Sequence, residues 1–170
     1  DTCGEAIYGD GRVIAAYGEA EANLYAQALF YISSHVGEAG HNCPVACTAG
    51  VAKILATVAS PELKKAYLGR VLTASWEKGY TGAQFLTEVQ GGSDVGANDV
   101  HAVPDGEGFG TTRWKITGEK WFCSNADADL ILMTARPKDA PKGTKGLGLF
   151  LVLRRLESGK ANHYALRRLK

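Results

Sequence analysis

Residues 85–94 read FLTEVQGGSD, and they follow closely on the point where the character of the chain changes. An apolar run meets Thr87 and Glu88, and the chain then turns on two glycines into Ser93. The stretch predicts either an ordinary strand end with a tight turn, or a turn whose exposed amides bind a ligand, since glycine allows close approach to the backbone. On local features alone, the ordinary turn is the favoured interpretation.

The residues before this stretch predict helices. One long amphipathic helix is expected over 13–36, because apolar residues recur there at helical spacing. They are Tyr17, Ala20, Leu24, Ala28, Ile32 and Val36. Pro44 is expected to open a second helix that ends at residue 59. Ser60 followed by Pro61 is typical of an N-cap and a first helical position, so a third helix is expected over 61–72.

The residues after Gly79 predict strands. Short apolar runs occupy 83–87, 100–103, 112–117, 130–135 and 147–153. The glycine-rich PDGEGFG of 104–110 is expected to connect a hairpin. Because a run of helices is followed by a run of strands, the pattern indicates an α+β fold and not alternating βαβ units.

Composition excludes several classes of function. The 170 residues carry a formal net charge of +1, with 45% hydrophobic and 22% charged residues, which is typical of a globular protein with no global attraction to nucleic acid. No apolar run approaches the roughly 20 residues of a membrane span. Because the chain starts with neither methionine nor a signal-peptide pattern, we expect a piece of a longer protein.

The cysteines do not form a recognisable metal-binding pattern. Cys43 and Cys47 are one helical turn apart and His41 precedes them, but no second ligand pair of the usual spacing follows. Small buried thiols in a reducing compartment are therefore expected, and no metal.

A second stretch, KWFCSN at 120–125, places Trp121 and Phe122 beside Ser124. Taken alone, it predicts a strand with its two aromatic side chains on opposite faces. Taken together, LTEVQGGSD (86–94) and GEKWFCSN (118–125), separated by the expected hairpin, resemble the paired motifs of the acyl-CoA dehydrogenase flavoprotein family. The resemblance covers essentially the whole chain.

The resemblance also implies an architecture and a branch of the family. A helical domain at 1–79 would pack on an antiparallel, β-barrel-like middle domain at 80–170. QGGSD, KWFCSNADADL, EAGHNCPVACT and LFLVLRRL are similar to the branch that contains the adaptive-response protein linked to DNA alkylation damage.

FAD is the cofactor that the resemblance implies. The first motif would run along the pyrimidine edge of the flavin, using backbone groups and the Thr87 hydroxyl, where fixed donors stabilise the negative charge of the reduced ring. Phe122 would flank the ring, and Ser124 would hydrogen-bond flavin N5. The cofactor-binding residues expected in this way are Gln84, Phe85, Leu86, Thr87, Gly92, Ser93, Phe122, Cys123 and Ser124.

Three positions depart from the family pattern. Many members carry tryptophan at Phe122, threonine at Ser124 and proline at Val89. Phenylalanine keeps the packing surface but lacks the indole N–H donor, and serine keeps the hydroxyl. Flavin binding is therefore expected to be retained.

The reaction implied by the resemblance is α,β-dehydrogenation of an acyl-CoA with hydride transfer to the flavin. The glutamate base of the family belongs to a C-terminal helical domain, which we expect after Lys170. No catalytic residue is therefore expected here, and the chain alone is expected to be inactive. Glu88 is expected to be a structural carboxylate.

An alternative function is a flavin-containing, DNA-associated alkylation-response protein with weak dehydrogenase activity. Basic residues near the C-terminus would supply its surface, although a solvated charged face is the favoured interpretation of Arg154, Arg155, Arg167, Arg168 and Lys170. A binding module without flavin would require the two motifs to be paired by chance. The resemblance further implies a cytoplasmic homo-oligomer with acyl-CoA as its small-molecule partner and no membrane.

Overall fold

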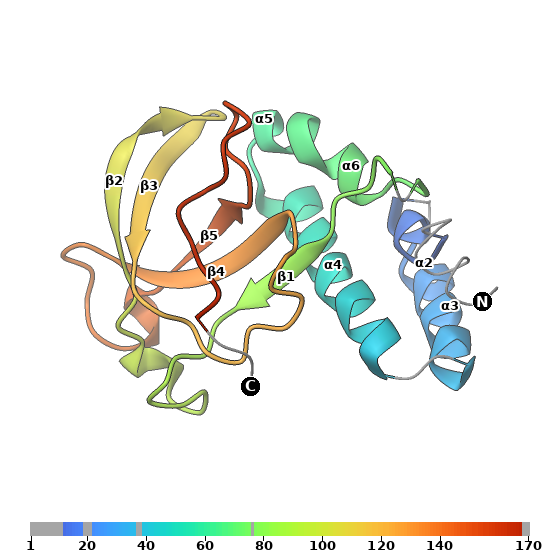
Figure 1. Ribbon diagram of the computed structural model, residues 1–170, viewed down its shortest axis with the longest axis horizontal. Coiled ribbons are helices and arrows are strands. Elements are labelled where there is room, and N and C mark those ends of the chain that lie inside the picture. The colour runs from blue at the N-terminus through green and yellow to red at the C-terminus, as the bar shows by residue number, and fades with distance from the viewer. Residues whose placement is uncertain (1–11, 19–21, 37–38, 76, 168–170) are drawn as a thin grey trace.

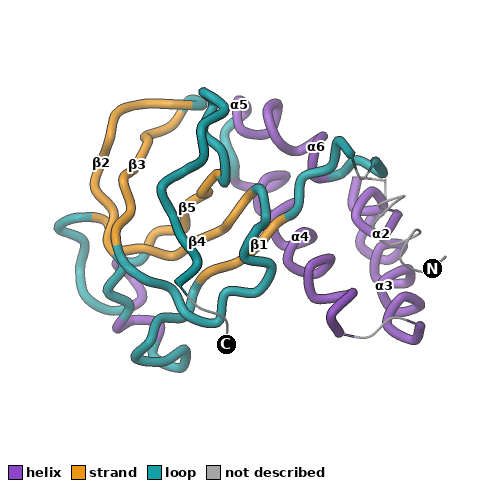
Figure 2. The backbone as a smooth tube through the Cα atoms, in the orientation of Figure 1, coloured by secondary structure: helices purple, strands orange, loops and turns teal. Residues whose placement is uncertain are grey.

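Helices and strands occupy separate halves of the molecule. The computed structural model describes residues 12–18, 22–36, 39–75 and 77–167. The helices gather on one side of the sheet, and the strands follow in the second half of the described chain (Figures 1 and 2). This arrangement confirms the α+β class. None of the helices among the described residues is both long enough and apolar enough to cross a membrane.

The first helical segment is divided. Helix α2 (Arg12–Ala15) leads into a tighter 3-10 turn (Ala16–Gly18), and α3 (Ala22–Val36) is a separate helix, so one helix over 13–36 was wrong. The predicted apolar face was also wrong, because Leu24 and Ile32 are exposed. The opposite face is buried instead, since Ser33 donates a 2.6 Å hydrogen bond to buried Asn42 at the start of α4.

Helix α4 (Ala39–Val58) is the central helix of this layer. It begins before Pro44, which lies inside it, so the expected start at the proline was wrong. The hydrogen bonds between Asn42 and α3 fix the first turn ahead of the proline. Further along, Val51 lies so close to strand β1 that a Cβ on Gly82 would come within 2.6 Å of its Cγ2. Glycine at that position therefore lets α4 pack directly on the sheet.

The third helical segment begins as the sequence predicted. The Ser60 side chain accepts a 3.2 Å hydrogen bond from the Leu63 N–H, and Pro61 occupies the first turn. The segment consists of α5 (Pro61–Leu63), a π-helical turn (Lys64–Leu68) and α6 (Gly69–Val71).

The sheet is mixed and open. Its strands are β1 (Gly82–Phe85), β2 (His101–Gly108), β3 (Thr111–Thr117), β4 (Leu130–Pro137) and β5 (Gly148–Leu153). Strand β4 pairs with β1 in parallel and with β5 antiparallel, and its last residues pair in parallel with the start of β2. The hairpin β2–β3 is antiparallel.

The expected antiparallel barrel was therefore wrong. Strands β1 and β3 lie at the two ends of the order β1-β4-β2-β3, and no pairing between described strands closes the sheet. The parallel pairs arise because β4 returns to both β1 and β2 after long connections. Parallel strands require such crossovers, which leave no local signal of the kind a hairpin turn leaves.

The β2–β3 hairpin turns later than expected. The strands extend through Gly108 and Thr111, and only Phe109 and Gly110 connect them, with φ of 50° and 67°. Two consecutive positive φ angles match the type I′ turn, whose twist fits paired strands. The other glycines of PDGEGFG lie within β2, where the register shifts between Pro104 and Glu107.

One core joins the two halves. Val51, Leu55 and Val71 of the helical layer pack with Leu130 and Leu132 of β4. Tyr67 and Tyr80 pack against this cluster. The boundary predicted at 79/80 falls in the connection between α6 and β1.

Candidate functional site

The two sequence motifs lie side by side. The first follows the end of β1, and the second lies in the loop that connects β3 to β4. The Trp121 N–H donates to the Thr87 carbonyl at 2.8 Å, and Lys120 Nζ donates to the Leu86 carbonyl at 3.1 Å. These two bonds bring residues that are far apart in the sequence into one surface.

A buried ion pair lies beneath this surface. Lys120 Nζ is 2.7 Å from Glu88 Oε1, and the two side chains are 3% and 5% exposed. The N–H groups of Asp99 and Val100 also donate to the carboxylate. Burial alone raises the pKa of Glu88, but the hydrogen bonds from Asp99, Lys120 and Val100 outweigh it and hold the pKa below its ordinary value. Both oxygens of the carboxylate therefore accept hydrogen bonds from other parts of the chain, which gives Glu88 a structural role.

Folding stability is expected to fall on acidification because of Glu88. A carboxyl whose pKa is lower in the folded chain contributes stability above its unfolded pKa, close to 4.5, and loses it as the pH falls through the folded value. Denaturant unfolding at a series of pH values from about 7 to about 3 measures this loss. In the Glu88→Gln variant, the free energy of unfolding should fall less steeply with decreasing pH. An unchanged pH dependence would contradict the role assigned to Glu88.

The glycine turn of the first motif exposes its backbone. The Gly91 N–H donates to the Glu88 carbonyl at 3.0 Å, and the φ of Gly91 is 130°, in a region that favours glycine. A Cβ on Gly92 would lie 3.2 Å from the Thr87 hydroxyl oxygen, so glycine lets the turn close over that hydroxyl. Gly92 and Ser93 are exposed. A backbone hydrogen bond therefore closes the turn, and the backbone of the turn is still accessible to a ligand.

The second motif is a loop and not the expected strand. Phe122 and Asn125 have φ of 54° and 52°, outside strand conformation. Asn125 Nδ2 donates to the Gly82 carbonyl at 2.9 Å, so the loop is fastened to the start of β1 as well as beyond its end. The Phe122 ring packs edge-on against Trp121 and remains 56% exposed. A strongly exposed aromatic ring therefore directly follows Trp121, the residue that joins this loop to Thr87 of the first motif.

The structure places most of the predicted cofactor residues on this surface. Leu86, Gly92, Ser93, Phe122 and Ser124 are exposed, and Gln84, Thr87 and Cys123 are half-buried. Phe85 and Cys123 pack together in a small core cluster. Gln84 lies against α4, where its Nε2 donates to the Cys47 carbonyl at 3.3 Å.

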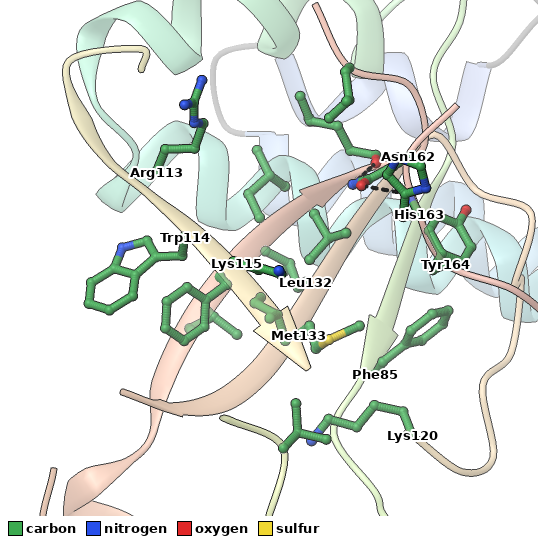
Figure 3. A pocket seen from close by; sticks show the side chains of 18 of the residues that line it. Phe85, Arg113, Trp114, Lys115, Lys120, Leu132, Met133, Asn162, His163 and Tyr164 are labelled. Carbon is green, nitrogen blue, oxygen red and sulfur yellow. Dashed lines mark hydrogen bonds between the residues drawn. The ribbon is translucent and has the colours of Figure 1, made fainter. Parts of the chain in front are cut away.

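A large cleft is lined by residues 118–124 of the second motif but by none of residues 86–94 of the first. The cleft, of about 2160 Å³, runs along the inner face of the sheet between β3, β5 and residues 162–167 (Figure 3). Of the predicted cofactor residues, Phe85, Phe122, Cys123 and Ser124 line it. It is larger than the roughly 300–1,000 Å³ of a usual ligand pocket. We therefore interpret it as an uncovered inner face of the sheet.

Sequence reasoning missed the polar residues that support the two motifs. Asn98, buried to 2% exposure, donates to the Leu86 carbonyl at 2.7 Å, and the Thr134 hydroxyl lies between Asn98 and Lys120. Arg136 donates to the carbonyls of Gly96 and Gly143 and so ties two surface loops together. These contacts join segments that are far apart in the sequence, so no local pattern predicts them. Among these polar side chains, only Lys120 lies within one of the two motifs.

The cysteines are less buried than expected. Cys43 is exposed, and Cys47 and Cys123 are half-buried, so the expectation of buried thiols was wrong for Cys43. Its place on the outer side of the first turns of α4 leaves it open to solvent. The described residues include no group of at least three His, Cys, Asp or Glu side chains that could hold a metal ion.

Alkylation is expected to distinguish these thiols. Burial, with a smaller contribution from Cys43, raises the pKa of Cys47 to about 11, and burial also raises the pKa of Cys123. Because the thiolate is the reactive form, iodoacetamide at about pH 8 should modify Cys43 first. Peptide mass spectrometry over time measures the order, and the differences should vanish in denaturant. Equal rates for Cys43 and Cys47 in the folded protein would contradict this prediction.

Comparison with known proteins agrees with the paired motifs. The family described as acyl-CoA dehydrogenase, middle domain, matches residues 83–164. Acyl-CoA dehydrogenase family member 11 of Caenorhabditis elegans is 36% identical over 84% of this chain and 23% of its own length. The putative acyl-CoA dehydrogenase AidB of Escherichia coli is 31% identical over 84% of this chain and 26% of its own length.

Solved structures agree with the fold. C. elegans ACDH-11 in complex with C11-CoA superposes with a TM-score of 0.76 at 32% identity, over 93% of this chain and 28% of that chain. The Bacillus anthracis acyl-CoA dehydrogenase complexed with FAD gives a TM-score of 0.51 at 25% identity, over 68% and 18% of the two chains.

A helical layer followed by a mixed sheet, with the two motifs joined at the end of β1, is the architecture of this chain, and the solved structures above share its fold. The chain belongs to the acyl-CoA dehydrogenase family. It spans about a quarter of the length of the two curated relatives described above.

Proposed function

We propose that this chain supplies one side of the FAD site of an acyl-CoA dehydrogenase. The observation that carries the proposal is the bond from the Trp121 N–H to the Thr87 carbonyl, which joins the motif with the accessible glycine turn to the motif with the exposed Phe122 ring. When bound, FAD supplies the acceptor for the hydride that leaves the acyl thioester. Family membership and the FAD and C11-CoA complexes of the similar proteins support both ligands.

The backbone at Leu86 and Thr87 fits a flavin edge. The Leu86 carbonyl points inward to Lys120 and Asn98. Because a trans peptide is planar, with its C=O and N–H antiparallel, the Thr87 N–H points the opposite way, toward the exposed side. An outward N–H beside the Thr87 hydroxyl provides the donors that the pyrimidine edge of a flavin accepts, and Phe122 offers a surface for its ring.

The chain holds the cofactor in this proposal and does not supply the base. Glu88, an acidic residue of the first motif, is buried, and both of its carboxylate oxygens accept hydrogen bonds. In this proposal the proton-abstracting carboxylate belongs to another part of the full-length protein, as the family resemblance implies, and the 170-residue chain alone is expected to turn over no acyl-CoA.

Spectroscopy of the full-length protein tests the proposal. Purified with FAD, it should show the visible absorption bands of oxidised flavin, and these should bleach when acyl-CoAs of increasing chain length are added without oxygen. A protein that remains colourless after incubation with excess FAD would contradict it. Bound flavin that no acyl-CoA reduces would support the proposed FAD site and contradict the proposed dehydrogenation.

No observation favours the DNA-associated alternative. The guanidinium groups of Arg154, Arg155 and Arg167 bond to groups of the chain itself: the Asp127 and Gly159 carbonyls and the Glu119 carboxylate. The three side chains are exposed, and these bonds agree with a solvated charged face; Arg168 and Lys170 lie outside the described residues. A cytoplasmic location and a homo-oligomeric state stay predictions of the family resemblance.

A further inference from the structure

Lys120 is saturated with acceptors that come from separate segments. Its ammonium, with three N–H donors, lies 3.1 Å from the Leu86 carbonyl, 2.7 Å from Glu88 Oε1 and 3.2 Å from Thr134 Oγ1. The side chain is 3% exposed, and lysine is almost never buried to this degree unless paired. Three bonds of this kind leave the side chain a single position.

The Leu86 carbonyl is the point where this network acts on the candidate cofactor surface. Asn98 Nδ2 donates to the same carbonyl at 2.7 Å from the other side, and Asn98 is itself held by Gln90. A carbonyl oxygen with two firm donors cannot rotate its peptide without breaking both bonds. The direction of the Thr87 N–H, on that same peptide, is therefore set by Lys120 and Asn98.

The same lysine also sets the second motif. The residue after it, Trp121, donates its N–H to the Thr87 carbonyl, and Phe122 follows directly. Figure 3 shows Lys120 at the end of the cleft where Phe85 lies. One buried side chain thus anchors the peptide that would face the edge of the flavin and the loop that would flank its ring.

We propose that Lys120, paired with Glu88, is a positioning residue that fixes the first motif against the second and thereby sets the affinity of the site for flavin. The proposal rests on the proposed function, since it concerns the same cofactor surface. It assigns no contact between Lys120 and the flavin. Its effect runs through the Leu86 carbonyl and the loop at 121–124.

Three variants of the full-length protein separate positioning from simple stability. Lys120→Met removes the donors and keeps most of the stem. Lys120→Met combined with Glu88→Gln also removes the unpaired buried charge, which should restore much of the stability. Lys138→Met makes the same change at an exposed lysine after β4 and is the matched control. FAD is titrated by quenching of its fluorescence, at a temperature where circular dichroism shows every variant folded.

The expected result is a dissociation constant for FAD raised at least about tenfold in Lys120→Met and unchanged in Lys138→Met. In the double variant the midpoint of unfolding should recover while the FAD affinity stays weak, because the Leu86 carbonyl has still lost its ammonium donor. A merely structural lysine would give recovery of both quantities together.

Two results would overturn the proposal. An FAD affinity of Lys120→Met equal to that of the control would do so, as would full recovery of affinity in the double variant. If the unsubstituted protein binds no FAD, the proposed function fails and the positioning role fails with it. The unsubstituted protein is therefore titrated first, which keeps the two failures distinguishable.

Discussion

Lys120→Met is expected to lower the free energy of unfolding by about 3–5 kcal/mol, which is the usual cost of removing one partner of a buried ion pair. The substitution leaves the Glu88 carboxylate at 5% exposure with only backbone donors. The deficit should be largest near pH 7, where Glu88 is charged. It should shrink on acidification, because a protonated carboxyl no longer needs the ammonium. Urea unfolding measures both effects.

The chain contains a matched control for this prediction. Arg167 and Glu119 form a second ion pair with the same 2.7 Å N–O distance, but their side chains are 74% and 44% exposed. Exposed pairs contribute about 0–1 kcal/mol, so Arg167→Met should cost little. Adding Glu88→Gln to Lys120→Met should recover part of the loss, since no buried charge then lacks its partner. Similar losses in Lys120→Met and Arg167→Met would show that burial does not decide the strength of the pair.

Local signals predicted the Ser60 cap and the positions of the five strands well, and the pairing of the strands poorly. The Ser60 cap and the five strand positions followed from residues that act on their immediate neighbours. The parallel pairing of β1 with β4 joins residues on either side of a whole hairpin, and nothing in either strand specifies it. The buried face of α3 depended on Asn42 in another helix, because both faces of α3 carry apolar side chains.

The candidate site shows the same division. The two motifs were visible as sequence stretches, and their resemblance to the family implied that Thr87 and Phe122 belong to one site. The contacts that join them were not visible, because the burial of Lys120 and its distances to Leu86 and Thr134 depend on where three segments meet. A lysine in a polar sequence predicts an exposed side chain. Only the packing of the fold makes this one a buried anchor.

Gly118→Ala is expected to lower the free energy of unfolding by about 3 kcal/mol or more, since two costs add. The φ of Gly118 is 143°, and a conformation of this kind costs a side chain about 1–3 kcal/mol. A Cβ there would also lie 2.6 Å from Val100 Cγ2 and 2.9 Å from its Cα. Val100 is 2% exposed and directly precedes β2, so it cannot move away. Overpacking of this kind costs about a further 1–3 kcal/mol.

Gly91→Ala separates the two costs, because Gly91 has a similar φ of 130° and a Cβ there would meet no atom within 4 Å. Its loss in urea unfolding should equal the backbone cost alone, and the excess in Gly118→Ala should equal the contact with Val100. Adding Val100→Ala to Gly118→Ala should recover only part of that excess, since the backbone Cα stays in place. Equal losses in the two glycine variants would mean that backbone conformation alone requires glycine ahead of the second motif. An excess in Gly118→Ala would mean instead that the close approach of the loop to β2 requires it.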